Sequence, residues 1–237
     1  VAVRSVETGE VRRMRNIQYM PDPRWSPDGR SLIAGTEDGK GRTGIFQFDV
    51  QSGQAKLIVQ TEGLGSNPRW SADGTKIFYV KTRPYNVEDM LIRERDLRTG
   101  VERDVFTHPM LRRGSGIEVS PDGRYLAVRM NSDPASQSSS VFLVPVGGGE
   151  SRELVRVPIA SEMNLAPTLN WTPDSRALLT ARKSGARVEL VLIDADTGFV
   201  RPLNVDVSEW TGGFTLSRDG RSLAFLMGKS GAEVWAL

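Results

Sequence analysis

The sequence of 237 residues predicts an all-β fold, a β-propeller built from four-stranded antiparallel blades. Three observations support this prediction. One short phrase recurs five times along the chain, a second turn signal recurs between its copies, and no long segment has helical periodicity. The copies lie 45 to 52 residues apart, which is about the length of four short strands with their turns in one propeller blade.

The repeated phrase reads PRWSPDGRSLIAG in its first copy, at residues 23–35. PRW predicts a short strand and SLIAG its return strand. In the SPDG turn between them, Pro27 has the fixed φ that suits a type I turn, and Gly29 can take the positive φ that closes a tight hairpin. The other copies are PRWSADGTKIFYV, IEVSPDGRYLAVR, LNWTPDSRALLTA and FTLSRDGRSLAFL, which begin at Pro68, Ile117, Leu169 and Phe214.

The second half of each repeat supplies two further strands around the second turn signal. In the first complete repeat, GIFQFDV at residues 44–50 predicts a third strand, QSGQ a turn, and AKLIV at residues 55–59 a fourth strand. The turn carries a glycine in every copy, and these are Gly9, Gly53, Gly100, Gly149 and Gly198.

Together the two signals predict a single propeller domain over residues 1–237. Residues 1–15 supply only the third and fourth strands of a blade, and residues 212–237 lack a fourth strand. We favour six blades with incomplete ends; closure into five blades is the alternative, although it leaves one strand too many. Because bare strand edges invite aggregation, we expect the chain to be a fragment or to lack segments. Four complete blades are expected at approximately 20–62, 66–108, 115–157 and 166–205.

Composition argues against several classes of partner. The net charge of +2 arises from 31 basic and 29 acidic residues, and no run of Lys or Arg exceeds two, so we expect no nucleic-acid partner. No apolar run approaches the roughly 18 residues of a membrane-spanning helix, so we expect no direct membrane insertion. Val1 is not a natural start, which leaves room for a removed signal peptide. The absence of Cys excludes disulfides and fits both the cytoplasm and the bacterial envelope.

The residues that recur in the phrase are interpreted as structural. Trp25, Trp70 and Trp171 occupy one position, which holds Val119 and Leu216 in the other copies. A position that accepts Trp, Val and Leu predicts packing between neighbouring blades. The turn aspartates are expected to bind local backbone N–H groups rather than a metal, and the preceding hydroxyls to form the same turns. These pairs are Ser26/Asp28, Ser71/Asp73, Ser120/Asp122, Thr172/Asp174 and Ser217/Asp219.

No motif for catalysis, cofactor binding or metal binding is found. His108 is the only histidine, and the chain has no G-x-S-x-G elbow, no H-E-x-x-H, no phosphate loop and no dinucleotide fingerprint. The glycine-rich segment 35–44 predicts a hairpin loop, because no helix follows it. The polar segment 131–140 lacks the oxygen spacing of a calcium loop. We therefore expect a non-enzymatic protein without cofactor.

Binding residues are expected in the channel and the rim loops of the propeller. The first strand of each blade has one polar position whose chemistry varies between copies, and this variation favours recognition over structure. The channel candidates are Arg24, Arg69, Glu118, Asn170 and Thr215. Arg, Tyr and Trp often anchor protein interfaces, and they supply most of the candidates from the loops. The rim candidates are Arg83, Tyr85, His108, Arg112, Arg113 and Trp210, the last of which precedes a first strand.

The segment PRWSPDGRSLIAG…GIFQFDVQSGQAKLIV resembles the WD40-like W-S-P-D-G repeat of the TolB-like β-propeller family, with its D-x-x-T-G second turn. The resemblance covers essentially the whole chain. The chain departs from the pattern at Ser175, which replaces the turn glycine, at Arg218, which replaces the proline, and at PVGGG, which lacks the second-turn aspartate. These departures predict less regular third to fifth copies.

The resemblance implies a protein- or peptide-binding module at a periplasmic or otherwise extracytoplasmic site in a bacterium, with the cytoplasm left open. It also implies two alternatives. One is the propeller gating domain of a prolyl-oligopeptidase-type peptidase, and the other is a sensor domain attached to a bacterial Ser/Thr kinase. A propeller lyase that uses channel His and Arg with a metal is disfavoured by the single His. The repeat specifies the fold far better than the function, because one fold serves many functions.

Overall fold

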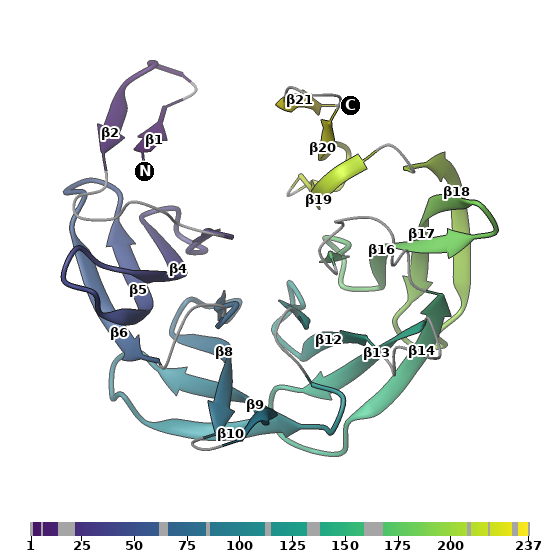
Figure 1. Ribbon diagram of the computed structural model, residues 1–237, viewed down its shortest axis with the longest axis horizontal. Helices are drawn as coiled ribbons and strands as arrows, with labels where there is room; N and C mark the ends of the chain where they lie inside the picture. The colour runs from purple at the N-terminus through teal and green to yellow at the C-terminus, as the bar shows by residue number, and fades with distance from the viewer. Residues whose placement is uncertain are drawn as a thin grey trace. The chain divides into compact units, whose positions relative to one another are not determined.

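A computed structural model describes the chain at residues 2–5, 7–13, 22–61, 66–83, 86–111, 115–131, 138–158, 168–207, 210–217, 219–228 and 232–236. In these ranges the regular structure consists of antiparallel β-sheets joined by turns, as Figure 1 shows. No helix long and apolar enough to cross a membrane occurs there. The chain divides into two compact units, Val1–Pro109 and Met110–Leu237, which are described separately.

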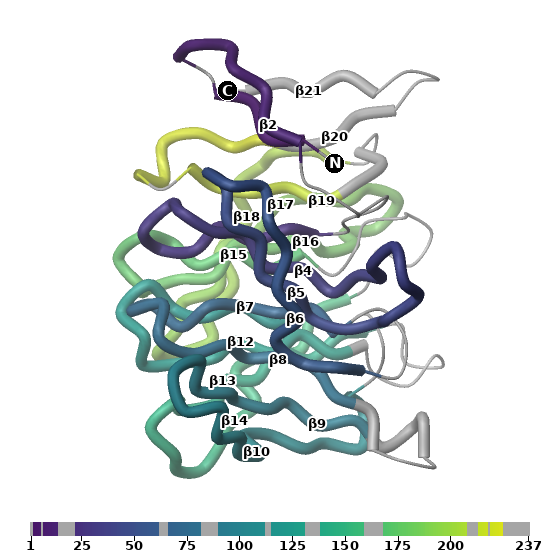
Figure 2. Tube along the Cα trace, turned by 90° about the vertical axis from the view of Figure 1, so that its left-hand side faces the viewer, coloured from purple at the N-terminus to yellow at the C-terminus, as the bar shows by residue number. Residues whose placement is uncertain are grey.

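The first unit contains a hairpin and two four-stranded sheets. The hairpin pairs β1 (Ala2–Arg4) with β2 (Val11–Arg13). The strands of the first sheet are β3 (Arg24–Trp25), β4 (Ser31–Glu37), β5 (Thr43–Asp49) and β6 (Ala55–Gln60). The strands of the second sheet are β7 (Arg69–Trp70), β8 (Lys76–Arg83), β9 (Asn86–Asp96) and β10 (Glu102–Thr107). Figure 2 shows β8, β9 and β10 side by side.

The second unit contains two four-stranded sheets and one three-stranded sheet. The first has β11 (Gly116–Val119), β12 (Tyr125–Asn131), β13 (Ser138–Pro145) and β14 (Arg152–Pro158). The second has β15 (Leu169–Trp171), β16 (Ala177–Ser184), β17 (Arg187–Asp194) and β18 (Val200–Asp206). The third has β19 (Trp210–Leu216), β20 (Leu223–Gly228) and β21 (Ala232–Ala236). The predicted four-stranded antiparallel blades are confirmed; the number of blades stays a prediction.

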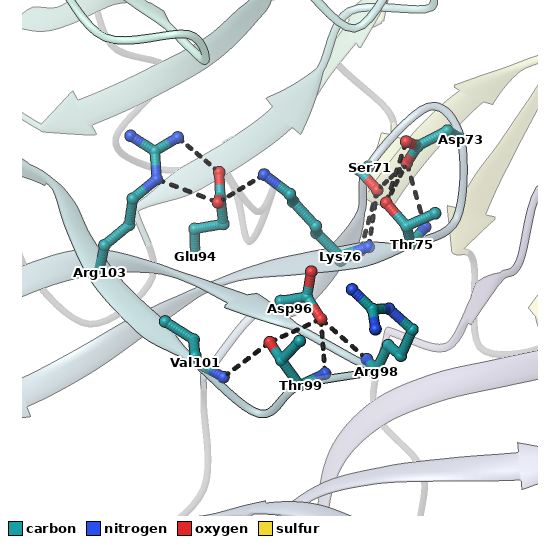
Figure 3. A network of polar contacts seen from close by, with 10 residues as sticks. All are labelled: Ser71, Asp73, Thr75, Lys76, Glu94, Asp96, Arg98, Thr99, Val101 and Arg103. Atoms are coloured by element: carbon teal, nitrogen blue, oxygen red, sulfur yellow. Dashed lines mark hydrogen bonds and ion pairs between the residues drawn. The ribbon is translucent and has the colours of Figure 1, made fainter.

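The first turn of each sheet is held by hydrogen bonds within six residues, as Figure 3 shows for the second sheet. The Ser71 hydroxyl donates to Asp73 Oδ1 at 2.6 Å, and this oxygen accepts the Thr75 N–H at 3.0 Å. Ser71 Oγ also accepts the Lys76 N–H at 2.9 Å. The Ser71 hydroxyl bond lowers the pKa of Asp73 below its usual value. The other four copies make the same contacts, which confirms the structural interpretation of both residues.

Ser175 keeps the turn although it replaces a glycine. Its φ is +61°, in the left-handed region that disfavours side chains, and its N–H still donates to the Thr172 carbonyl at 2.9 Å. Its Oγ accepts the backbone N–H of Asp122, in the first turn of the preceding sheet, at 3.1 Å. This contact between sheets offsets part of the strain. The departure at Ser175 therefore does not make the fourth copy irregular; Arg218 lies outside the described residues.

In the second turn of two sheets, the backbone geometry requires glycine, at Gly53 and at Gly198. Gly53 and Gly198 have φ of +69° and +75°, and a Cβ on either would meet a backbone carbonyl of the preceding sheet. That carbonyl belongs to Arg13, 2.7 Å from the Cβ position of Gly53, and to Leu154, 2.3 Å from that of Gly198. The glycine therefore serves both the left-handed turn and the close approach of two sheets.

The repeated tryptophan packs between sheets in two of its three copies. Trp70 is 8% exposed, lies in an apolar cluster with Ile33 and Ile45 of the preceding sheet, and donates its indole N–H to the Arg24 carbonyl at 3.1 Å. Trp171 is 7% exposed and donates in the same way to the Glu118 carbonyl at 3.1 Å.

Trp25 differs from the packing prediction, because it is 52% exposed. The packing of Trp70 and Trp171 depends on the first strand of the preceding sheet, which supplies the carbonyl that accepts the indole N–H. The hairpin β1–β2 precedes Trp25 and has two strands in the described part of the chain. The prediction of a buried Trp25 is therefore wrong for the described residues, although the residue type is the same in all three copies.

Candidate functional site

The five channel candidates all lie in the first strand of a sheet, as the repeat predicts. Each of these strands is an edge of its sheet, because it pairs only with the second strand. The strands are β3, β7, β11, β15 and β19, and they carry Arg24, Arg69, Glu118, Asn170 and Thr215, respectively. Side chains alternate along a strand, so the face opposite the buried Trp70 presents Arg69.

In the first unit, two of these candidates are joined by an aspartate. Asp22 Oδ1 lies 3.0 Å from Arg24 NH2, and Asp22 Oδ2 lies 3.0 Å from Arg69 NH1. The Arg69 side chain is 9% exposed and also donates to the Pro68 carbonyl at 3.0 Å. Arg24 and Asp22 remain substantially exposed to solvent. We call Asp22, Arg24 and Arg69 the arginine cluster; in it, one carboxylate bridges two guanidinium groups.

Asp22 was not identified from the sequence as a site residue. Its φ is +45°, and Asn67, at the equivalent position before the second Pro-Arg-Trp, has a φ of +43°. Asp and Asn tolerate the left-handed region better than other residues with side chains. The repeated Asx-Pro-Arg-Trp is the signal that could have identified Asp22, because the left-handed residue lies two positions before β3 and before β7.

In the second unit the candidates are not brought together in the same way. The side-chain amide of Asn170 donates to the Phe214 carbonyl at 3.1 Å, in the first strand of the next sheet. This contact gives Asn170 a structural role between sheets, which the recognition hypothesis did not foresee. Glu118 is partly exposed and Thr215 is exposed. The variable position is therefore structural in at least one copy.

The rim candidates are only partly described. Arg83 is the last residue of β8 and Trp210 the first of β19, opposite Met227, so both backbones lie in strands rather than in loops or before a strand. His108 stacks on Phe106, with ring centroids 6.0 Å apart and an interplanar angle of 8°. Tyr85, Arg112 and Arg113 lie outside the described residues.

The second sheet also carries an ionic network that sequence reasoning did not single out (Figure 3). Glu94 is 5% exposed, and its carboxylate accepts two bonds from Arg103, at 3.0 and 2.7 Å, and one from Lys76 at 2.8 Å. On the other face of β9, Glu102 lies 2.9 Å from both Arg93 and Arg95. Burial raises the pKa of Glu94, but the Arg103 and Lys76 bonds outweigh it and leave the pKa below its usual value.

Glu94→Gln is expected to lower the free energy of unfolding by about 1–3 kcal/mol at pH 7, since it removes charge-assisted hydrogen bonds. The pKa of Glu94 is lower in the folded state than in the unfolded chain, so this stabilisation is complete above the usual glutamate pKa of 4.5 and disappears as the pH falls through the folded value. Urea unfolding at pH 7 and pH 3 measures both effects. Glu37→Gln, at an exposed glutamate, is the control. If acidification lowers the free energy of unfolding by the same amount in the wild type and in Glu94→Gln, the prediction is contradicted.

The described residues contain no group of three or more His, Asp or Glu side chains placed to hold a metal ion. The arginine cluster has the chemistry of an anion-binding surface, because guanidinium groups bind carboxylates through paired, charge-assisted hydrogen bonds. It is therefore the arrangement that best supports recognition of another molecule.

No family model matches the chain. The Tol-Pal system protein TolB of Alcanivorax borkumensis is 27% identical over 70 residues, which are 30% of this chain and 16% of that protein. TolB of Francisella tularensis subsp. mediasiatica is 30% identical over 64 residues, 27% of this chain and 14% of that protein. The uncharacterized peptidase YuxL of Bacillus subtilis is 28% identical over 123 residues, 51% of this chain and 17% of the peptidase. The chain thus spans less than a fifth of each of these relatives.

Solved structures show the same fold over nearly the whole chain. The crystal structure of TolB from Acinetobacter baumannii has a TM-score of 0.74 at 17% identity and covers 92% of this chain and 51% of that chain. The β-propeller domain of the Trilobed protease from Pyrococcus furiosus has a TM-score of 0.68 at 15% identity and covers 100% of this chain and 73% of that domain. An oligogalacturonate lyase in complex with manganese scores 0.72 at 15% identity, with coverages of 97% and 64%. These likenesses establish the fold alone.

Proposed function

We propose that this chain, a TolB-like β-propeller, is a non-enzymatic module that binds a protein or peptide partner at an extracytoplasmic site in a bacterium. The short matches to TolB proteins support this proposal, and so does the match of fold. The arginine cluster is the observation that carries it. The partner surface that suits this cluster is an acidic segment, because carboxylates form charge-assisted hydrogen bonds with guanidinium groups.

The geometry of the cluster supports a role in contact with a partner. Arg69 is held from two sides, by Asp22 and by the Pro68 carbonyl, so little conformational entropy remains to be lost on binding. Arg24 is more exposed and shares the same aspartate. A partner carboxylate can approach Arg24 while Asp22 keeps both guanidinium groups in position. Arginine held in this way is a frequent energetic anchor of protein interfaces.

Affinity capture from an envelope extract of the source organism tests this proposal. The native chain is expected to retain one acidic partner that a bait with Arg24→Glu and Arg69→Glu loses. A second bait carries Arg24→Gln and Arg69→Gln, which remove the cations without adding negative charge beside Asp22. This bait shows whether a loss of binding by the Glu variant is due to misfolding. The matched control carries Arg176→Glu and Arg187→Glu, two exposed arginines, and should retain the partner. Equal retention by all baits would move the site away from the cluster.

A second candidate is the propeller domain of a peptidase. The match to YuxL favours it, because that match spans about half of this chain, which is more than either TolB match spans. The parent coding sequence separates the two candidates. A catalytic α/β domain with a G-x-S-x-G elbow in the same open reading frame would support the peptidase, and its absence would support the binding module.

A further inference from the structure

Arg129 is a buried cation in the second unit. It lies on β12 and is 5% exposed. Its Nε donates to Ser139 Oγ on β13 at 3.0 Å, and its NH1 donates to Thr180 Oγ1 on β16, in the next sheet, at 2.6 Å. Both hydroxyls are fully buried. The guanidinium therefore lies between β12 and β16, which belong to neighbouring sheets of this unit (Figure 1).

The charge of Arg129 is not balanced by a carboxylate within ion-pair distance in the described ranges. The other buried charged side chains have such partners: Arg69 pairs with Asp22, and Glu94 with Arg103 and Lys76. Burial lowers the pKa of Arg129 to about 10, so the group stays protonated at neutral pH. A buried charge without an opposite charge is strongly destabilising.

A cation at the position of Arg129 is not required by the repeat. The equivalent position in the other copies of the repeated phrase holds Gly35, Val80, Ala181 or Leu226. Thr180 is also unusual, because its equivalents are Ala34, Tyr79, Val128 and Phe225. Two departures from the repeat thus face each other across neighbouring sheets and form one contact. The contact therefore belongs to this pair of sheets and is not part of the repeat.

The hydrogen bonds leave donors available for a ligand. Thr180 donates its own proton to the Thr168 carbonyl at 2.9 Å, so its oxygen lone pairs face Arg129. Ser139 Oγ accepts from Arg129 and keeps its proton to donate. The second terminal nitrogen of Arg129 has no acceptor among the described side chains and carbonyls. A guanidinium N–H pair next to a hydroxyl donor suits an oxygen anion.

We infer that Arg129 and Ser139, with Thr180 as the group that orients the guanidinium, bind an oxyanion of the carboxylate or phosphate class. The anion accepts hydrogen bonds from the free end of the guanidinium and from the Ser139 hydroxyl, and its charge compensates the buried cation. Thr180 contributes by position, because it fixes NH1 and leaves the other terminal nitrogen for the ligand. This site is separate from the arginine cluster, so the inference does not depend on the proposed function.

Thermal unfolding in the presence of sodium succinate or sodium phosphate tests this site, with sodium chloride at equal ionic strength as reference. The wild-type Tm is expected to rise with the logarithm of the anion concentration, by about 3–6 °C at ten times the dissociation constant, with at least one of the two anions. Succinate and phosphate separate the two ligand classes. Arg129→Met should lose the rise, whereas Arg24→Gln with Arg69→Gln should keep it, since those residues belong to the arginine cluster and not to this site.

If Arg129→Met fails to fold, isothermal titration calorimetry with the same two anions tests the site through a second variant, Thr180→Val. Thr180→Val keeps the cation but frees its NH1, and it is expected to weaken binding about tenfold, which corresponds to the loss of one charge-assisted hydrogen bond. A wild-type protein with no saturable response to either anion would overturn the site. So would a response of equal size in Arg129→Met, or one that disappears only when Arg24 and Arg69 are replaced.

Discussion

Replacement of Trp70 by alanine is expected to lower the free energy of unfolding by about 3–5 kcal/mol, the range found for large aromatic residues in a core. Two contributions add up here. The indole packs against Ile33 and Ile45 of the preceding sheet, so its removal opens a cavity between sheets. Its N–H also donates to the Arg24 carbonyl, which would be left without this partner. Urea unfolding followed by circular dichroism measures the loss.

Trp25→Ala is the matched control for Trp70→Ala, because the two residues occupy the same position of the repeat and differ in burial. At a site that is 52% exposed, the same substitution is expected to cost less than about 1 kcal/mol. Trp70→Phe separates the two contributions: it keeps an aromatic ring and loses the hydrogen bond. Similar losses for Trp70→Ala and Trp25→Ala would show that packing between sheets does not explain the repeated tryptophan.

Gly198→Ala is expected to lower the free energy of unfolding by about 2–4 kcal/mol, through left-handed backbone strain and overpacking together. The new Cβ would lie 2.3 Å from the Leu154 carbonyl oxygen, which belongs to the backbone of β14 and cannot rotate away. The contact can be relieved only if the two sheets separate or the turn changes conformation. Either change also strains the Arg152 bond to the Ala195 carbonyl, which is 2.6 Å long.

Gly185→Ala measures separately the cost of placing a side chain on a left-handed backbone. Gly185 has a φ of +62°, close to the +75° of Gly198, but no atom lies within 4 Å of its Cβ position. Its substitution should cost about 1–2 kcal/mol from the left-handed conformation alone. The difference between the two variants, measured by chemical unfolding, gives the cost of the contact between sheets. If the free energy of unfolding falls by the same amount in both variants, the contact of the new Cβ with β14 has no cost and the prediction is wrong.

The sequence predicted the two arginines of the arginine cluster but not its aspartate. Arg24 and Arg69 were identified because their position varies in chemistry between copies of the repeat. Asp22, which joins them, was missed because nothing in a single sequence states which acidic residue lies between two arginines 45 positions apart. Asn170 was identified by the same rule, yet its amide bonds the backbone of the next sheet. Variation between copies marks positions that are free to change, and it does not distinguish recognition from contacts between sheets.

The sequence by itself determined the strands, the antiparallel hairpins and the turns. Those features depend on contacts within a few residues, such as the Ser71–Asp73 hydrogen bond and the left-handed glycines. The tertiary structure alone decided that Trp70 is buried while Trp25 is exposed, and that Arg129 meets Thr180 across two sheets. The physical reason is distance along the chain. A local turn is encoded by the residues that form it, whereas a contact between sheets depends on residues one repeat apart and on what stands beside each sheet in space.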